Sequence, residues 1–334
     1  MMDQEKNLLP FEKEKREIIV LRNAETSLKF GKNPEDRAAS ELLDYGIVIL
    51  DKPSGPTSHQ VSFYVKQLLH IEKCGHSGTL DPKVTGILPI ALGRGTRVVQ
   101  ALLPAGKEYV CLMHLHAEVP KEKLLEVFSQ YSGRIKQLPP KKSAVKRQWR
   151  ERNVYYLELL DMIGQDVLFR VGCQAGTYIR KLCHDIGQTL GIGAHMLELR
   201  RTKAGPFTEG QLCTLQDLTD AFYYHINENN ETYLKKCILP FEAAVSGLPK
   251  VFVLDSTVDS LCHGASLKVP GIAKLETGII SDDLVAVLTL KGELIGLGNA
   301  KMSSEDMQKF SSGISVILNQ VFMQPGVYPK MEKK

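Results

Sequence analysis

The sequence lacks the features that would place this protein in a membrane or in an oxidising compartment. Nowhere do 18 apolar residues follow one another, which argues against a membrane span. The segment from Met1 to Arg22 mixes acids and bases and has no apolar core, unlike a signal peptide. The seven cysteines are scattered singly without a CxxC pair, so no zinc knuckle or thioredoxin-type site is indicated. We therefore expect a cytoplasmic protein with reduced, mostly buried thiols.

A large excess of one charge is also missing. The 42 basic and 38 acidic residues leave a net charge of +4, which permits a polyanionic partner without requiring one. The chain has 334 residues, 43% of them hydrophobic and 24% charged, which is ordinary globular composition and enough for two domains. The sequence offers no cluster of metal ligands and no internal repeat, so neither a metal cofactor nor a repeat architecture is expected.

The patterning divides the chain into three parts. Residues 1–45 are charge-rich and weakly periodic, and we expect this extension to gain order only by packing on the C-terminal domain. Residues 46–249 interleave strand and helix patterns without a strict βαβ rhythm, which predicts an α+β domain around a mixed or antiparallel sheet. In residues 250–330 short segments bounded by glycine predict a small β-barrel or sandwich.

The most informative segment is GHSGTLDP at residues 75–82. Its glycines allow a sharp turn or a close approach to a ligand, and Pro82 restricts Asp81 to an extended conformation at the end of a loop. An isolated Asp-Pro pair is more often a turn in a solvated loop. Periodicity and spacing alone therefore leave the role of Asp81 open.

Four ordered motifs carry a resemblance to a known family. They are LDKPSGPTSH at 50–59 with GHSGTLDPKVTGILPIALGRGTRVVQ at 75–100, KEY at 107–109, GTYIR at 176–180 and GAHMLELRRT at 193–202. Together they resemble the signature of the pseudouridine synthases related to bacterial tRNA uridine isomerases, and their length makes the match specific. The resemblance implies an enzyme that isomerises uridine in structured RNA without a cofactor.

The resemblance implies a role for each matching residue. Asp81 stands at the position of the catalytic aspartate, which acts on the ribosyl carbon or its neighbouring proton. Tyr109 matches the tyrosine that stacks on the flipped uracil and helps to remove its C5 proton, and Arg180 matches the arginine that pairs with the catalytic carboxylate. Three further positions match residues that line the pocket or admit the nucleotide: His76, Tyr178 and Leu199.

These roles are physically coherent, although each residue also has an ordinary explanation. Flipping a base out of RNA costs a few kcal/mol, and stacking on an aromatic ring returns about 1–3 kcal/mol. A guanidinium keeps a carboxylate charged in a pocket from which water is largely excluded. Taken singly, however, such tyrosines are core aromatics and such an arginine is a solvated charge. Only their joint occurrence around Asp81 favours catalysis.

A basic run occupies residues 141–152 (KKSAVKRQWRER) and includes the single tryptophan of the chain. A solvated strand face is the ordinary explanation. Because the run follows Pro139-Pro140 into a loop, we predict instead a surface that contacts RNA phosphates. Its basic members are Lys141, Lys142, Lys146, Arg147, Arg150 and Arg152.

The segments HGASLKVPGI at 263–272 and DLVAV at 283–287 resemble the PUA RNA-binding domain. Its glycines allow close approach of RNA, and the apolar Leu267 and Ile272 are expected to pack against splayed nucleotides. Structural turns explain each glycine equally well. The predicted RNA contacts of this domain are Gly264, Ala265, Leu267, Pro270 and Gly271.

Residues 101–109, 142–147 and 194–201 resemble the archaeal and eukaryotic guide-RNA branch of these enzymes, the dyskerin family. This implies a box H/ACA guide RNA, substrate rRNA or tRNA, and small protein subunits as partners, with no membrane partner. The short MEKK ending, where eukaryotic members carry a lysine-rich tail, indicates an archaeal-type cytoplasmic protein. A stand-alone tRNA pseudouridine synthase and an RNA-binding scaffold with an inert catalytic domain remain alternatives.

Overall fold

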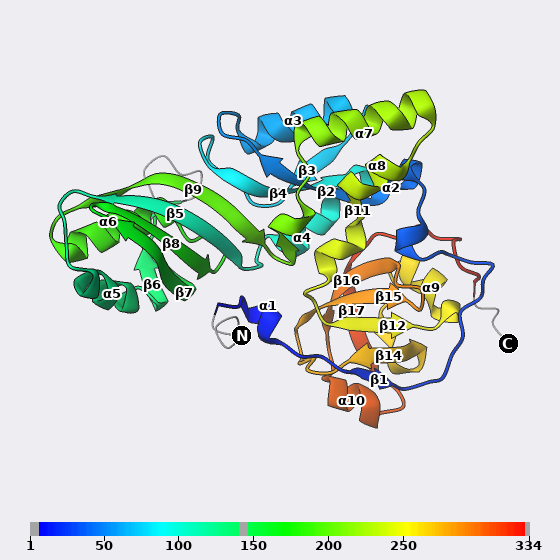
Figure 1. Cartoon of the computed structure of the whole chain (residues 1–334). Coiled ribbons are helices and arrows are strands. Elements are labelled where there is room, and N and C mark those ends of the chain that lie inside the picture. Colours follow the sequence, from blue (N-terminus) through cyan, green and yellow to red (C-terminus); the bar gives the residue numbers. More distant parts are fainter. Residues whose placement is uncertain (1–6, 140–145, 331–334) are drawn as a thin grey trace.

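Two sheets organise the computed structural model, which describes residues 7–139 and 146–330 (Figure 1). The architecture is α+β with a small C-terminal β domain, as predicted. Strands of the ten-strand sheet, in spatial order, are β11 (Ile238–Pro240), β2 (Gly46–Lys52), β4 (Thr85–Leu92), β9 (Ala194–Ala204), β5 (Lys107–Leu115), β8 (Asp166–Cys173), β7 (Arg150–Ile163) and β6 (Gly133–Gln137). On its margins β3 (Cys74–His76) pairs with β4, and β10 (Phe207–Thr208) pairs with β9.

A short parallel pair joins the two halves of this sheet. Strand β4 meets β9 only where Thr85 and Gly86 face Arg200 and Arg201, whereas β2 and β4 on one side and β5 and β9 on the other are antiparallel. Each half packs its own hydrophobic cluster. The loop that carries Asp81 leads directly into β4, so the fold places this residue at the junction of the halves.

Helices cover the halves separately. Figure 1 shows α3 (Ser58–Leu68) and α7 (Leu215–Glu228) together over β2 and β4, while α5 (Lys121–Gln130) and α6 (Ile179–Leu190) cover the half that contains β5 and β8. The apolar stripe of α6 is buried, and Gly191 ends that helix in a left-handed conformation with φ 77°. The N-cap of α3 is Thr57, whose hydroxyl accepts from the Gln60 N–H.

The C-terminal sheet curls into a half-barrel. Its strands in spatial order are β1 (Ile18–Val20), β14 (Ile272–Glu276), β12 (Lys250–Val253), β15 (Leu284–Thr289), β16 (Leu294–Ala300), β17 (Ile314–Val321) and β13 (Leu267–Lys268). Its edge strand β1 comes from the N-terminal extension and pairs antiparallel with β14. The remaining helices are α1 (Pro10–Lys13), α2 (Ala39–Tyr45), α4 (Val99–Leu102), α8 (Thr232–Cys237), α9 (Asp255–Cys262) and α10 (Ser304–Lys309).

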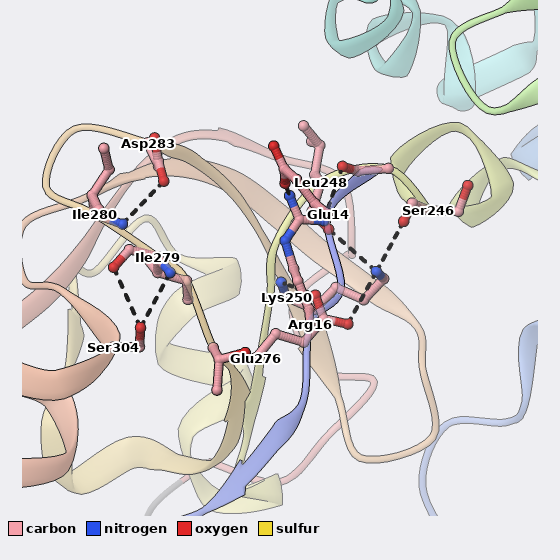
Figure 2. Close-up of polar contacts among 12 residues, drawn as sticks. Glu14, Arg16, Ser246, Leu248, Lys250, Glu276, Ile279, Ile280, Asp283 and Ser304 are labelled. Carbon is pink, nitrogen blue, oxygen red and sulfur yellow. Dashed lines mark hydrogen bonds and ion pairs between the residues drawn. The ribbon is translucent and has the colours of Figure 1, made fainter. Parts of the chain in front are cut away.

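The two sheets share a hydrophobic core. One buried cluster combines Ile47 and Phe241 with Leu288, Leu294 and others from the C-terminal sheet. The connecting segment is also tied by polar contacts (Figure 2): the Lys250 ammonium donates to the backbone oxygens of Ser246 at 3.0 Å and Leu248 at 3.2 Å, and pairs with Glu276. The C-terminal domain therefore contributes to the stability of the whole fold. Within the described residues no helix has the length and apolarity needed to cross a membrane.

Candidate active site

The loop of residues 77–84 holds Asp81 through contacts made by its neighbours. The Ser58 hydroxyl donates to the Leu80 oxygen at 3.1 Å and accepts from the Leu80 N–H at 2.9 Å. The Val84 N–H donates to the Asp81 backbone oxygen at 3.0 Å. Gly78 has φ 75°, and a Cβ there would lie 3.2 Å from an Arg201 nitrogen, so a larger residue would crowd the loop. The backbone on either side of Asp81 is thereby fixed.

A buried lysine also holds the same loop by hydrogen bonds to its backbone. The Lys52 ammonium is fully buried and donates to the backbone oxygens of Pro53 at 2.8 Å, Pro82 at 2.9 Å and Val84 at 2.9 Å. Burial lowers the Lys52 pKa, and the charge of Asp81 opposes that shift. Sequence analysis gave Lys52 no role, although a lysine that ends an apolar strand just before a proline was a visible signal.

Arg180 pairs with Asp81, as predicted. It lies in the first turn of α6, and its Nη2 donates to Asp81 Oδ2. The two side chains are 59% and 55% exposed, respectively, so the largely dry pocket expected around the carboxylate is not present in the protein alone. The pair is therefore open to solvent in the free protein.

Tyr109 and Leu199 lie on the neighbouring strands β5 and β9, where Tyr109 faces Arg201 and Leu199 faces Cys111. Both are partly buried against the core of that half. Burial raises the Tyr109 pKa, while the charge of its cross-strand neighbour Arg201 acts in the opposite direction. Tyr109 is therefore a neutral phenol at neutral pH.

Tyr178 is the N-cap residue of α6, and a buried glutamine fixes it. The Tyr178 N–H donates to Gln137 Oε1 at 3.0 Å, and its backbone oxygen accepts from Gln137 Nε2 at 3.2 Å. Because Arg180 follows two residues later, this exchange also sets where α6 starts relative to Asp81. Gln137 was not identified from the sequence, since a polar residue at a strand end is unremarkable there.

His76 ends β3 beside the Asp81 loop. Its ring contacts the Ser62 hydroxyl at 3.2 Å and the Thr79 hydroxyl at 3.4 Å, and it meets the His59 ring edge-on at 4.8 Å. Burial lowers the His76 pKa to about 4, with His59 and Arg201 adding to the shift. His76 is therefore uncharged at neutral pH.

This pKa makes the stability of the protein depend on pH. In the unfolded chain His76 binds its proton near pH 6.5, but in the folded protein only near pH 4, so acid favours unfolding within this window. We expect the contribution of neutral His76 to the free energy of unfolding to be complete above pH 6.5 and to be lost progressively as the pH falls towards 4. Urea unfolding of wild type and His76→Gln across this range measures it. Parallel stability curves for the two proteins would contradict the expectation.

A surface cavity of about 420 Å³ adjoins Arg180. Arg147 and Trp149 from the basic run line it together with Lys181 and His184 of α6, and Trp149 is 67% exposed. An exposed tryptophan between cations suits stacking of a nucleic-acid base. The surface beside Asp81 is thus basic and aromatic.

The other members of the predicted basic set differ in their exposure to solvent. Lys146 is exposed, whereas Arg150 and Arg152 are partly buried on β7. Arg152 donates to the Glu151 backbone oxygen at 2.7 Å, and its guanidinium lies against Gly176. Lys141 and Lys142 lie outside the described residues.

The predicted contacts of the C-terminal domain need one correction. Leu267 and Ile272 are fully buried in the core of the C-terminal sheet, so the expectation that they pack against nucleotides does not fit. Their apolar character is explained by folding. Gly264, Ala265 and Pro270 are exposed and Gly271 partly so, and these positions remain candidates.

No group of three or more His, Cys, Asp or Glu side chains in residues 7–139 and 146–330 is arranged to hold a metal ion. Asp81, Arg180 and Tyr109 together offer an anionic group at a fixed position, a cation beside it and an aromatic ring. Such a set suits chemistry at a sugar carbon next to a stacked base.

Comparison with protein families matches most of the chain in four segments. Residues 66–179 match the TruB family pseudouridylate synthase N-terminal domain, and residues 180–246 match the tRNA pseudouridylate synthase B C-terminal domain. Residues 249–322 match the PUA domain, and residues 6–62 match the DKCLD domain.

Sequence relatives agree with this assignment. A protein of Methanothermobacter thermautotrophicus named "Probable tRNA pseudouridine synthase B" is 54% identical over 94% of this chain and 97% of its own length. A protein of Pyrococcus furiosus with the same name is 53% identical over 99% of this chain and 98% of its own.

Two solved structures are similar over nearly their full length. One, described as "Crystal Structure of a Cbf5-Nop10-Gar1 Complex", has a TM-score of 0.93 and 54% identity and covers 97% of this chain and 99% of its own. The other, described as "Structure of H/ACA RNP bound to a substrate RNA containing 2'-deoxyuridine", has a TM-score of 0.92 and 51% identity and covers 97% and 100%.

Proposed function

This chain belongs to the TruB family of pseudouridylate synthases, and we propose that it isomerises uridines of structured RNA selected by a guide RNA. The carrying observation is the Asp81–Arg180 pair at the sheet junction, beside Tyr109. Similarity to a protein solved in an H/ACA ribonucleoprotein with substrate RNA supports the guide-dependent form. The proposed RNA substrates are rRNA and, as a further class, tRNA.

In the proposed reaction the C1′–N1 bond of the target uridine breaks, and a C1′–C5 bond forms after the base turns over. Asp81 acts at the ribose while Arg180 keeps its carboxylate ionised. The pair is open to water in the free protein, so bound RNA must cover it. Because Tyr109 is a neutral phenol, its ring holds the base by stacking. The proton leaving C5 goes to the carboxylate of Asp81, and the freed N1 takes up a proton, so the product is an isomer of uridine.

The cavity beside Arg180 would hold the RNA next to the target nucleotide. Trp149 offers a ring for a neighbouring base, worth about 1–3 kcal/mol by stacking. Arg147 and the exposed Lys146 would contact phosphates. Gly264, Ala265, Pro270 and Gly271 are proposed contacts of the C-terminal domain with the guide RNA.

Removing the basic residues of this surface should weaken RNA binding. With Lys146, Arg147 and Arg150 replaced by alanine, fewer counterions are released, so the slope of log affinity against log salt should become shallower by roughly 0.7–0.9 for each lost phosphate contact. Filter binding between low and moderate salt measures both quantities. A Lys121→Ala/Lys123→Ala variant on α5, which removes two positive charges from another surface, serves as the comparison. An unchanged slope with reduced affinity would assign the three residues to folding.

Guide dependence is tested by an isomerisation assay on rRNA and tRNA substrates, with and without a box H/ACA guide RNA and the small partner proteins. The names of the sequence relatives specify tRNA, which favours the alternative, a stand-alone tRNA enzyme. We expect rRNA modification only with the guide and partners. Equal modification of naked tRNA by the chain alone would establish the alternative instead.

The same similarity supports two further proposals. Since solved relatives are described in complexes with Nop10 and Gar1, small proteins of these kinds are proposed partners. A third relative is described as "archaeal", and archaeal cells have no nucleus, which supports a cytoplasmic location. Fractionation of cells that express the tagged chain checks the location.

A further inference from the structure

Arg201 is the largest of the fully buried side chains, and the mechanism above does not use it. It lies on β9 and is 1% exposed. Its Nε donates to the Ile87 oxygen at 2.7 Å, and its Nη2 donates to the Gly78 oxygen at 3.0 Å. On β5 its cross-strand neighbour is Tyr109, whose oxygen offsets part of the effect of burial on the Arg201 pKa. The side chain therefore ties β4 to the Asp81 loop beside the tyrosine of β5.

Arg201 carries its charge without a carboxylate partner. The ion pairs among the described residues do not include it, whereas its neighbour Arg200 pairs with both Asp51 and Glu209. Burial lowers the Arg201 pKa, and the Tyr109 oxygen is the side-chain group that offsets this. Burying a cation against neutral oxygens alone is costly. A purely structural clamp would more simply be uncharged, so the retained charge calls for a role in the site.

We propose that Arg201 is a positioning residue of the isomerisation, which fixes the Tyr109 hydroxyl relative to the loop that carries Asp81. This inference rests on the proposed function. A guanidinium suits the task because its donors form a rigid planar fork, so the backbone oxygens of Ile87 and Gly78 fix its orientation beside Tyr109. The flexible ammonium of a lysine has no such fork. Arg201 would then keep the ring that stacks on the base at a fixed position relative to the carboxylate that acts on the ribose.

The test is a double-mutant cycle measured in the assembled complex under single-turnover, saturating conditions. Arg201→Lys should lower the rate by about a hundredfold, the cost of a misplacement near 1 Å, while RNA affinity stays within a few-fold. In a Tyr109→Phe background the same change should cost at most a few-fold, because the shared hydroxyl is already gone. Arg200 lies one position away on β9. The rate losses caused by Arg200→Lys and by Tyr109→Phe should therefore be additive. Additive losses for Arg201→Lys in an active enzyme would overturn the inference.

A second measurement does not require Arg201 variants to fold. Tyr109→Phe removes an acceptor from a buried cation, so it should lower the Tm of the free protein clearly more than Tyr223→Phe, whose side chain is exposed on α7. Equal Tm values for the two variants would show that the contact is not formed and would overturn the inference. A folded wild-type complex without isomerisation would instead overturn the proposed function.

Discussion

Replacing Asp81 with asparagine should abolish isomerisation, with a rate loss of at least about a thousandfold, near the upper range for removal of a reacting acid or base. The amide has nearly the size of the carboxylate, but it can neither attack the ribose nor accept the C5 proton. RNA affinity should stay within a few-fold, because Lys52 and Ser58 hold the loop by its backbone and not by the Asp81 side chain. Release of tritium from C5-labelled uridine measures the rate.

Asp51→Asn is the matched control for Asp81. Asp51 also pairs with an arginine, Arg200, at 2.9 Å, and it also lies at the end of a strand beside the sheet junction. Loss of an exposed or half-exposed ion pair costs about 0–1 kcal/mol of stability, so both variants should remain folded. If Asp81→Asn retains a rate close to that of Asp51→Asn, Asp81 has no place in the chemistry.

The helices and the function of the Asp81 loop were predicted from two different kinds of sequence information. The stripe on α6 was visible because its apolar residues repeat with helical spacing, and Gly191 marked its end. The function of Asp81 was not visible in that way, since an Asp-Pro turn has many uses. It came from the order of four motifs. The contact between Asp81 and Arg180 bridges 99 residues, a distance in sequence across which periodicity carries no information.

Buried polar residues were the main omission. Lys52, Gln137 and Arg201 are each charged or polar, and a sequence pattern places such residues at the surface. Their partners are backbone oxygens and hydroxyls supplied by distant elements, so only the folded chain reveals them. The opposite error occurred at Leu267, an apolar residue expected at the RNA surface that lies in the core.

The shared core also limits how the domains can be separated experimentally. A chain that ends at Leu248 would keep Asp81, but it would expose the cluster around Phe241 and lack β14, the partner strand of β1. Point changes in exposed C-terminal residues are therefore the better probe of guide binding.

Replacing Arg180 with methionine should cost about a hundred- to a thousandfold in rate, corresponding to the 3–5 kcal/mol of a desolvated carboxylate left without its partner. In the free protein the Asp81–Arg180 pair is more than half exposed, so its loss should change the free energy of unfolding by no more than about 1 kcal/mol. The large effect arises only once RNA covers the pair and lowers the local dielectric constant. Single-turnover rates at saturating RNA, together with urea unfolding, separate the two quantities.

The comparison that decides the argument is between Arg180 and another partly exposed arginine that forms an ion pair outside the site. Arg170 pairs with Glu158 at 3.2 Å, and its side chain is 37% exposed. Arg170→Met should therefore match Arg180→Met in stability and leave the rate near wild type. Arg180→Lys, which keeps a charge but not the planar fork, should recover part of the lost rate. If Arg180→Met lowers only RNA affinity and reaches the wild-type rate at saturation, Arg180 binds the RNA backbone and does not support the carboxylate. The buried ammonium of Lys52, whose charge interacts with Asp81, would then be a candidate for supporting the carboxylate.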